Sequence, residues 1–287
     1  MYSKPTPRVI LETLLPHLRV AAAYARQIQP MIGALPSKEE GDNFFAAALT
    51  DADLAVQNLV EVVLLGNFPQ ISFYGEEFEL SGNTKYFRSL ELETEGDYLI
   101  TLDPIDGTQF YKDGHSNYQI ILSVLSANEF EAVIAVSPAL NVYFYTIKGE
   151  GTFRGSLEMD LEACEPLKVT NCQQRILLGW EMGELAVVLK EHYEVIDVAT
   201  CYSQKEQIPN LNGILSGEIA GAVIRRGKFI DGAAIAFLAK EAGCIVTTFD
   251  GGKLPPLSEC SNYSLPGLIV ASSQSVHQHL LEAVRSL

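Results

Sequence analysis

Apolar residues recur at helical spacing along the first part of the chain. In residues 9–29 every third or fourth position is apolar, which predicts an amphipathic helix. A second helix is predicted over residues 44–65, because a glycine and then a proline follow its last turn. The apolar residues of this second helix that are expected to face inward are Leu54, Leu59, Val62, Val63 and Leu65.

Short β-rich runs come next and predict an antiparallel meander. Residues 71–74 and 97–102 each predict a strand, and the polar, acidic residues 78–96 between them predict a surface excursion. The following runs are separated by short polar turns, so each is expected to pair with its neighbour in sequence. These strands are predicted at residues 118–126, 132–138, 141–147 and 151–153.

Beyond residue 155 strand-like and helical runs alternate, which is typical of an α/β layer arrangement. The strands are predicted at residues 175–178, 195–199, 220–224, 244–247 and 267–271, and the helices at residues 184–191, 231–242 and 273–286. The predicted fold class is therefore α/β with α+β character. We expect two closely packed halves, residues 1–155 and 156–287.

Composition narrows the class of protein. The 287 residues are 47% hydrophobic and 20% charged, which is typical of a globular protein with a substantial core. The net charge of −16 argues against a nucleic-acid polymer or an anionic membrane surface as partner. The five cysteines are odd in number and form no Cys-x-x-Cys, which favours reduced thiols and a cytoplasmic protein. No secretion signal and no membrane span of about 18 apolar residues is expected.

Two carboxylates follow directly after one predicted strand. Asp103 and Asp106 stand three residues apart in a segment that also contains Pro104 and Gly107. Pro104 is expected to stop the strand pairing, because proline has no backbone N–H, and Gly107 permits a backbone geometry closed to most residues. Two acids on a stiff turn suit a cation site better than a hydrophobic core.

Two further acids stand where a strand ends or a helix begins, Glu76 and Asp231. Each has a purely structural interpretation, Asp231 as a helix N-cap and Glu76 as a surface acid. Oxygen ligands without His or Cys, however, suit a hard cation such as Mg²⁺ or Mn²⁺. Carboxylates brought close together repel one another, so such a site is expected to need its metal.

Three segments resemble the signature motifs of the inositol monophosphatase family, of the lithium-sensitive, magnesium-dependent sugar-phosphatase superfamily. They are Gly75-Glu76-Glu77, Asp103-Pro104-Ile105-Asp106-Gly107-Thr108 and Asp231-Gly232-Ala233-Ala234. Two more, Thr50-Asp51-Ala52-Asp53 and residues 148–153, resemble the family's Thr-x-x-Asp and Lys-Gly-x-Gly-Ala-Phe segments. The resemblance covers residues 44–252 and implies a layered α-β-α-β-α sandwich.

The resemblance also implies a set of metal ligands. One Mg²⁺ would be held by Glu76, Asp103 and the backbone carbonyl of Ile105, and a second by Asp103, Asp106 and Asp231. A third, weaker ion would use Glu76 through water, and Mn²⁺ is an alternative to Mg²⁺.

The implied catalytic residues are Glu76, Thr108 and Asp53. Thr108 would orient the attacking water and Asp53 would accept the threonine hydroxyl proton. Their structural alternatives are a helix cap and a solvated helix acid. The backbone N–H groups of Gly107, Thr108 and Gln109, at a helix start, would bind the substrate phosphate.

Departures from the family pattern cluster in the second half. Ile230 stands where the family has a tryptophan, and residues 201–212 lack a clear Gly-Ser/Thr-Ala segment. Ile224 stands seven residues before Asp231, where inositol-specific members carry an acid that binds sugar hydroxyls. Arg225 and Arg226 follow it and could meet a second phosphate, although exposed arginines at a strand end are common.

The sequence therefore predicts a magnesium-dependent phosphomonoesterase acting on a small phosphorylated polyol such as inositol monophosphate. A 3′,5′-bisphosphate nucleotide or a sugar bisphosphate is the alternative substrate. A different class of function is a weakly catalytic protein that binds metal or a phosphate ligand. Because the family forms dimers, a homodimer is expected.

Overall fold

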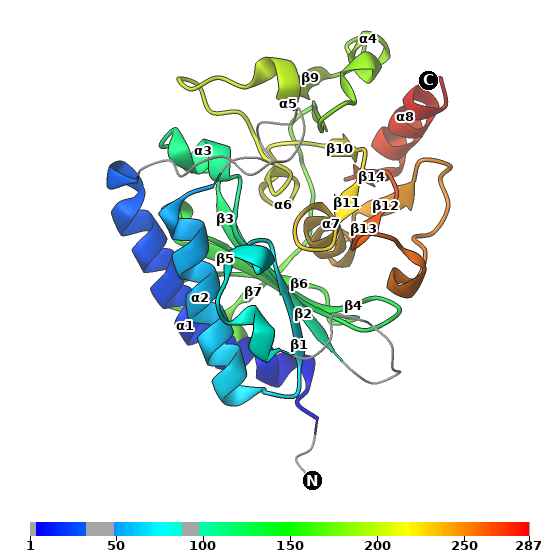
Figure 1. Ribbon diagram of the computed structural model, residues 1–287. Coiled ribbons are helices and arrows are strands. Elements are labelled where there is room, and N and C mark those ends of the chain that lie inside the picture. Colours follow the sequence, from blue (N-terminus) through cyan, green and yellow to red (C-terminus); the bar gives the residue numbers. More distant parts are fainter. Residues whose placement is uncertain (1–3, 33–48, 88–97, 287) are drawn as a thin grey trace. The chain divides into compact units, whose positions relative to one another are not determined.

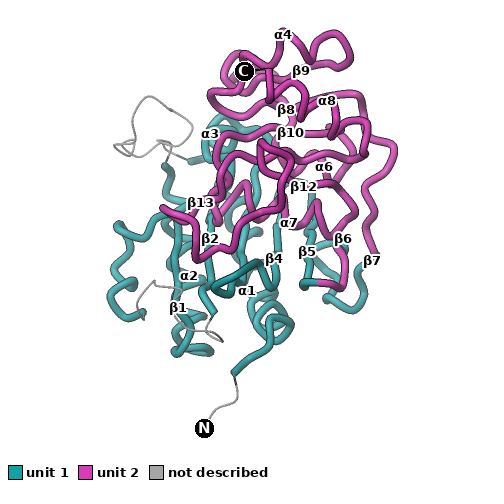
Figure 2. The backbone as a smooth tube through the Cα atoms, turned by 90° about the vertical axis from the view of Figure 1, so that its right-hand side faces the viewer, with its two compact units in different colours: residues 1–148, 153–165 teal, residues 149–152, 166–287 magenta. Residues whose placement is uncertain are grey.

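A computed structural model of the protein describes residues 4–32, 49–87 and 98–286. The chain divides into two units, shown in teal and magenta in Figure 2. Unit 1 consists of residues 1–148 and 153–165, and unit 2 of residues 149–152 and 166–287. Both helices and sheets are present, so the predicted mixed α and β fold class is confirmed.

In unit 1, two long helices run side by side along one face of a sheet (Figure 1). Helix α1, Pro7–Ile28, agrees with the predicted first helix, and the hydroxyl of Thr6 accepts the N–H of Val9 at its start. Helix α2, Asp51–Asn67, begins later than predicted, because Thr50 is its N-cap and has an extended backbone. Residues 44–48 of the prediction lie outside the described part of the chain.

The face of α2 that packs inward also differs from the prediction. Val63 is buried, but Val62 is 60% exposed, and Leu54, Leu59 and Leu65 are only partly buried. Three of the fully buried residues are polar, and a prediction based on the spacing of apolar residues does not include them. The buried residues of α2 are Ala52, Asp53, Val56, Gln57, Val60, Glu61, Val63 and Leu64.

Within the described residues, the sheet of unit 1 has seven strands in the order β1-β2-β3-β4-β5-β6-β7. The predicted meander is confirmed, since β2 to β5 pair antiparallel with their neighbours, while β1 and β2 are parallel. The strands are β1 Ser72–Gly75, β2 Leu99–Asp106, β3 Gln119–Leu125, β4 Phe130–Ser137, β5 Val142–Ile147, β6 Thr152–Ser156 and β7 Glu165–Leu167.

Short helical segments connect these strands. Residues 78–87 of the predicted surface excursion contain two 3₁₀ turns, Phe78–Leu80 and Thr84–Tyr86, and residues 88–96 lie outside the described part. Further 3₁₀ turns are Gln29–Met31, Pro138–Leu140 and Leu161–Ala163. Helix α3, Thr108–Lys112, follows β2 directly, so the end of β2 and the start of α3 meet at Gly107.

Unit 2 is built on a mixed sheet with strand order β12-β14-β10-β8-β9. Strands β10, β8 and β9 are parallel, whereas β14 runs antiparallel to β10 and β12. The strands are β8 Arg175–Leu178, β9 Glu194–Asp197, β10 Gly221–Ile224, β12 Ile245–Thr248 and β14 Leu268–Ala271. A two-stranded ladder of β11 Gly227–Lys228 and β13 Ser264–Leu265 was not predicted.

The alternation of helices with these strands was predicted and is confirmed. Helices α7, Gly232–Glu241, and α8, Gln274–Arg285, match the predicted segments within one or two residues. The segment predicted as a helix over residues 184–191 is shorter, a 3₁₀ turn, Gly183–Leu185, followed by α4, Ala186–Leu189. The remaining helical segments are α5 Val198–Cys201, α6 Gly213–Ser216 and the 3₁₀ turn Leu257–Glu259.

Each unit has a hydrophobic core of its own. In unit 1 the core lies between α1, α2 and the sheet and includes Leu14, Leu64 and Phe73. In unit 2 a core joins β8, β10 and β14 to α8 and includes Ile176 and Leu280. Two separate cores of this kind are what two structural units require.

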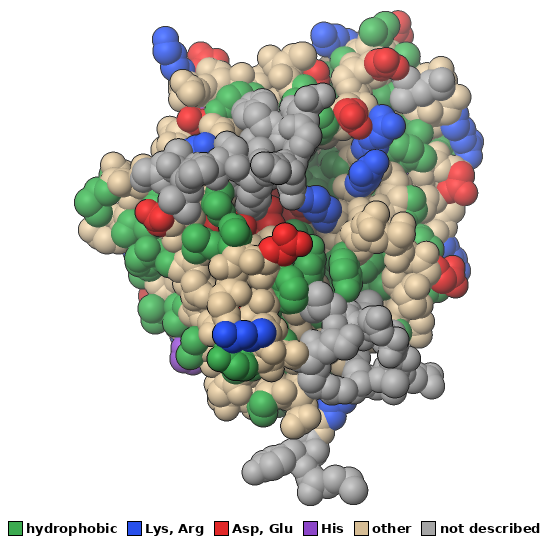
Figure 3. Space-filling model, viewed as in Figure 1, with side chains coloured by type: hydrophobic (Ala, Val, Ile, Leu, Met, Phe, Trp, Pro, Cys, Tyr) green, Lys and Arg blue, Asp and Glu red, His purple; other side chains and the backbone are tan. Residues whose placement is uncertain are grey.

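No helix in the described ranges is long and apolar enough to span a membrane. On the face drawn in Figure 3, acidic side chains are interspersed with basic and hydrophobic ones, although the whole chain carries a net charge of −16.

Two substitutions test which face of α2 is buried. Leu64→Ala opens a cavity in the core of unit 1 and should lower the free energy of unfolding by about 2–5 kcal/mol. Val62→Ala, two residues away on the exposed face, should change it by no more than about 0.5 kcal/mol. Urea denaturation followed by circular dichroism measures both free energies of unfolding. Similar losses of stability in the two variants would contradict this assignment of the buried face.

Candidate active site

The parallel pairing of β1 and β2 places two acidic residues side by side. Gly75 pairs with Leu102, so Glu76 and Asp103 occupy the next positions on the two strands. The backbone N–H of Glu76 donates to the carbonyl of Leu102 at 2.9 Å and continues the ladder by one residue. Glu76 and Asp103 therefore lie where the parallel pairing of β1 with β2 ends.

A β-bulge in β2 determines how Asp103 and Asp106 are presented. Asp103 pairs with Ile121 and Asp106 pairs with Gln119, so three steps along β2 match two steps along β3. The prediction that Pro104 ends the pairing was therefore wrong. Proline cannot donate to the ladder, but a bulge accommodates it and the strand resumes at Asp106.

The bulge changes the face on which the second carboxylate lies. In a regular strand, residues three apart point to opposite faces. With one extra residue in β2, Asp103 and Asp106 oppose residues two apart on β3, which share a face. The bulge thus places both carboxylates on the same side of the sheet.

Local hydrogen bonds orient these two carboxylates. The backbone N–H of Ile105 donates to Asp103 Oδ1 at 3.1 Å, and Gln119 Nε2 donates to Asp106 Oδ2 at 2.7 Å. Asp103 is buried and Asp106 is half-buried. These bonds give both carboxylates a defined orientation at the end of β2.

Gly107 turns the chain from β2 into α3. Its backbone is left-handed, with φ 84° and ψ 37°, a conformation that glycine adopts without steric cost. The predicted use of this glycine is confirmed. The turn places Thr108 at the first position of α3, directly behind the two carboxylates.

The structure brings Thr108 and Asp53 together from positions 55 residues apart. The Thr108 hydroxyl lies 3.1 Å from Asp53 Oδ1 and 2.8 Å from the carbonyl oxygen of Ile105. With a single proton, it donates to one of these acceptors at a time. Both side chains are buried, Asp53 completely.

Asp53 is fixed by the start of α2. Its Oδ2 accepts the backbone N–H of Thr50 at 2.8 Å and the Thr50 hydroxyl at 2.6 Å, in a capping box. The Thr-x-x-Asp segment therefore forms the first turn of the helix. Asp53 is a buried hydrogen-bonded acid, so the structural alternative of a solvated helix acid was wrong.

Three polar residues around these acids were missed from the sequence. Gln119 donates to Asp106, and Gln57 and Glu61 lie buried on α2. Gln57 Oε1 accepts the backbone N–H of Glu77 at 2.8 Å, which ties α2 to the segment that carries Glu76. The available signal was the four-residue spacing of Asp53, Gln57 and Glu61, which places them on one helix face.

Two tyrosines behind Asp53 remain neutral. Burial, followed by the nearby Tyr118 and Asp53, raises the pKa of Tyr111 well above its ordinary value, and burial raises the pKa of Tyr118 to about 12. Tyr111 therefore keeps its proton and donates to the carbonyl of Ala25 at 2.7 Å. Tyr111 thereby joins α3 to α1, and neither phenol acts as a base near neutral pH.

In unit 2, Asp231 is the N-cap of α7 and its Oδ1 accepts the backbone N–H of Gly232. Apolar side chains surround this turn. A Cβ on Gly232 would lie 2.9 Å from Ile224 Cδ1 and 3.9 Å from Leu211 Cδ2, and Ile230 is buried. The N-cap interpretation of Asp231 is thereby confirmed as one of its roles.

The two arginines after Ile224 are both exposed at the end of β10. Arg225 forms an ion pair with Glu181, Nε to Oε2, at 3.2 Å. Arg225 is therefore already paired with an acid of its own unit, which weakens its case as a phosphate ligand.

The donor chemistry at the end of β2 suits a hard cation, although the side chains are not gathered around one point. Within the described ranges, no three His, Cys, Asp or Glu side chains form a group that could hold a metal ion. Carboxylate and carbonyl oxygens are the ligands that Mg²⁺ takes in proteins, so the residue types fit.

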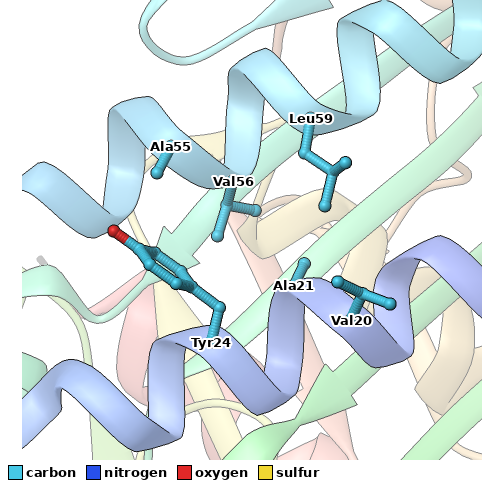
Figure 4. A pocket seen from close by; sticks show the side chains of 6 residues that line it. All are labelled: Val20, Ala21, Tyr24, Ala55, Val56 and Leu59. Carbon is cyan, nitrogen blue, oxygen red and sulfur yellow. The ribbon is translucent and has the colours of Figure 1, made fainter.

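A shallow hollow elsewhere in unit 1 does not fit this chemistry. It measures about 190 Å³ and lies between α1 and α2, as Figure 4 shows. Its lining is apolar apart from the Tyr24 hydroxyl and consists of Val20, Ala21, Tyr24, Ala55, Val56 and Leu59. It offers no ligand set for a metal or a phosphate.

Comparison with known proteins gives a consistent family. The model of the inositol monophosphatase family matches residues 18–287. The Nus factor SuhB of Escherichia coli is 24% identical over 94% of this chain and 96% of its own length. Nus factor is the name of that relative, and at this low identity the name does not transfer to this chain.

Solved structures show the same fold. The IMPase of Thermotoga maritima superposes with a TM-score of 0.73 at 20% identity, over 96% of this chain and 97% of the other. An IMPase/NADP phosphatase complexed with Mg²⁺ and phosphate superposes with a TM-score of 0.68 at 18% identity, over 96% and 94%. At these identities the structures establish the fold alone.

The family match extends over nearly the whole chain and supports a phosphatase of this superfamily, while the substrate differs among the similar proteins. Together with the bulged Asp103–Asp106 strand end and the bonded Thr108–Asp53 pair, it shows that the chain is a divergent member of the inositol monophosphatase family.

Proposed function

We propose that the protein is a metal-dependent phosphomonoesterase that hydrolyses a small phosphorylated polyol. The observation that carries this proposal is the bulge in β2, which places Asp103 and Asp106 on one face beside Glu76. Structural roles alone do not require two acids on one face next to a third. A cation that binds them would relieve their mutual repulsion.

Glu76, Asp103 and the carbonyl of Ile105 are the proposed ligands of one ion, and Asp103, Asp106 and Asp231 those of a second. Glu76 would hold a third, weaker ion through water. When bound, Mg²⁺ or Mn²⁺ would make water more acidic and neutralise charge on the phosphoryl group and the leaving oxygen. The protein's task in such a reaction is mainly positioning and charge stabilisation.

Thr108 and Asp53 are proposed to orient the attacking water. When the Thr108 hydroxyl donates its hydrogen bond to Asp53, its oxygen can accept a hydrogen bond from the attacking water. Asp53 is held in turn by the two donors of Thr50, so the hydroxyl has a preferred direction. This geometry suits general-base activation through a fixed relay.

The phosphate is proposed to bind the backbone N–H groups of Gly107, Thr108 and Gln109. The first N–H groups of a helix have no acceptor within that helix, and they attract anions. These donors, with the cations, would let a chain of net charge −16 bind a phosphate ester.

The substrate proposal depends on the surroundings of Asp231. Ile224 packs against Gly232 there, and its apolar side chain offers no oxygen that could bind sugar hydroxyls. Inositol monophosphate is therefore one candidate polyol phosphate, and a 3′,5′-bisphosphate nucleotide or a sugar bisphosphate is the alternative. The exposed Arg226 favours a second phosphate, and the similar IMPase/NADP phosphatase acts, by its name, on a nucleotide.

A binding protein with weak catalysis is a second candidate from another class. The similarity over 94% of the chain to a protein named Nus factor SuhB favours it, as do the replaced Ile224 and Ile230 and the altered segment 201–212. The retained carboxylates favour the enzyme. The homodimer expected from the resemblance stays a prediction, which light scattering of the purified chain would check.

Phosphate release from a panel of phosphomonoesters separates the two candidates. The panel should contain inositol monophosphate, sugar bisphosphates and 3′,5′-bisphosphate nucleotides, with Mg²⁺, with Mg²⁺ plus Li⁺, and with EDTA. We expect turnover that EDTA abolishes and Li⁺ inhibits.

Asp103→Asn should abolish both turnover and Mg²⁺ binding, whereas Asp51→Asn, at an exposed acid of the same unit, should retain both. Absence of turnover on every substrate would favour the binding protein.

The Thr108–Asp53 relay predicts a contrast between two threonines. Thr108→Val removes the hydroxyl and should lower kcat on the order of 10²-fold or more, while Thr108→Ser keeps most of the activity. Thr101→Val is the matched control, because the buried Thr101 hydroxyl has no hydrogen-bond partner among the described residues. Equal kcat values for Thr108→Val and Thr101→Val would rule out the relay.

The apolar surroundings of Asp231 predict a change of specificity. Ile224→Glu supplies an acid beside this turn and should raise kcat/KM for inositol monophosphate relative to other phosphomonoesters. Ile224→Leu keeps the position apolar and is the control. Steady-state kinetics on the same panel measures the ratio, and an unchanged ratio would exclude Ile224 as a specificity determinant.

A further inference from the structure

Helix α2 buries three polar side chains in a row. Asp53, Gln57 and Glu61 are four residues apart and all have 0% exposed surface. Residues four apart lie on the same face of a helix, so the three form a line along the inward side of α2. Burying a polar group is unfavourable unless it is hydrogen-bonded, and the proposed chemistry uses Asp53 alone.

Gln57 contacts the backbone of the segment that carries Glu76. Its Oε1 accepts the backbone N–H of Glu77 at 2.8 Å. On the other side of Glu76, a Cβ on Gly75 would overlap the Gln57 carboxamide. Gly75 has no positive φ, so a glycine is needed here for space and not for backbone conformation.

The backbone of Glu76 is thereby held on two sides. Its own N–H donates to the carbonyl of Leu102 on β2 at 2.9 Å, and the next N–H, of Glu77, donates to Gln57 on α2. Strand β2 carries Asp103 one residue after Leu102. The two bonds therefore fix the position of Glu76 relative to Asp103.

Glu61 determines which way the Gln57 carboxamide faces. Glu61 Oε1 accepts from Gln57 Nε2 at 3.0 Å, and the Ser81 hydroxyl donates to Glu61 Oε2. Since Glu61 Oε1 is the acceptor in this bond, the NH₂ group of Gln57 faces Glu61. The carbonyl oxygen of Gln57 is then directed at the N–H of Glu77, which needs an acceptor.

We infer that Gln57 is a positioning residue for the metal ligand Glu76 and that Glu61 locks Gln57 in the required orientation. This inference rests on the proposed function, in which Glu76 binds a metal ion. Groups that orient metal ligands in this way affect metal affinity about 10- to 100-fold. Gln57 and Glu61 act through the backbone of Glu76 and Glu77 and are not themselves catalytic.

The first test compares two glutamine-to-leucine variants of the full chain. Gln57→Leu keeps the volume of the side chain and removes the acceptor of the Glu77 N–H. Gln278→Leu on α8 is the matched control, because Gln278 also donates to a glutamate four residues on, Glu282, but is exposed. The measurements are Mg²⁺ affinity by calorimetry, kcat as a function of Mg²⁺ concentration, and hydrogen exchange of the Glu77 amide.

For Gln57→Leu we expect Mg²⁺ affinity to fall about 10- to 100-fold, with kcat recovering in part at high Mg²⁺. The Glu77 amide should exchange faster, while the amides of β2 remain protected. Gln278→Leu should match the wild type in all three measurements. A buried glutamine that serves packing alone would change stability without changing Mg²⁺ dependence.

The second test reverses the Gln–Glu pair. Gln57→Glu keeps an acceptor for Glu77 but places a carboxylate against that of Glu61, which should weaken Mg²⁺ binding. The double variant Gln57→Glu/Glu61→Gln restores one donor and one acceptor at the same positions, so Mg²⁺ affinity should recover towards the wild-type value. This pair keeps the inference testable if Gln57→Leu does not fold.

The outcomes distinguish the inference from the function on which it rests. A wild-type chain without Mg²⁺ affinity or turnover would reject the proposed function, and the metal-positioning role with it. A wild-type chain that binds Mg²⁺, with unchanged affinity in folded Gln57→Leu or no recovery in the double variant, would overturn the positioning role alone.

Discussion

The geometry of the candidate site depends on one missing hydrogen-bond donor. Pro104 has no backbone N–H, and β2 accommodates it by a bulge between Asp103 and Asp106. Asp103 and Asp106 are three residues apart, a spacing that puts side chains on opposite faces of a regular strand. The extra residue of the bulge places them on the same face of the sheet. Without the bulge, one of the two carboxylates would point to the opposite face. A feature that would weaken an ordinary strand is here what places two candidate ligands on one face.

Helix α2 serves the core and the site with the same face. Its apolar side chains pack against the sheet of unit 1, while Asp53, Gln57 and Glu61 are buried beside them. Each buried polar group left without a partner would cost about 1–3 kcal/mol. Thr50 at the start of α2 is one partner, and the others are Thr108, Ser81 and the backbone of Glu77, which lie in the segments that follow the candidate ligands. The same hydrogen bonds therefore satisfy the buried polar side chains of α2 and position the candidate site.

Electrostatics explain why such a site can exist in a strongly acidic chain. The net charge of −16 opposes anion binding at a distance, but a phosphate responds most to the charges and dipoles within a few ångströms. The left-handed Gly107 starts α3 immediately behind Asp106, so backbone donors and carboxylates lie within a few residues of each other. Cations held by the carboxylates would complete a local field of the opposite sign to the global one.

The sequence by itself determined the fold class, most of the elements and the residue types of the site. Strict periodicity defines α1 and the meander, and the segment Asp-Pro-Ile-Asp-Gly-Thr contains the glycine that its turn requires, the left-handed Gly107.

Helix α2 and its neighbours show where this reasoning stops. A pattern of apolar residues could not identify Val62 as exposed or Gln57 and Glu61 as buried, because burial of a polar residue depends on partners that are distant in sequence. The pairing of the bulged strand with β3, the Thr108–Asp53 bond across 55 residues and the contact of Gln57 with the Glu77 backbone were decided by the tertiary structure. The physical reason is that a hydrogen bond needs both of its partners, and the folded chain supplies the second.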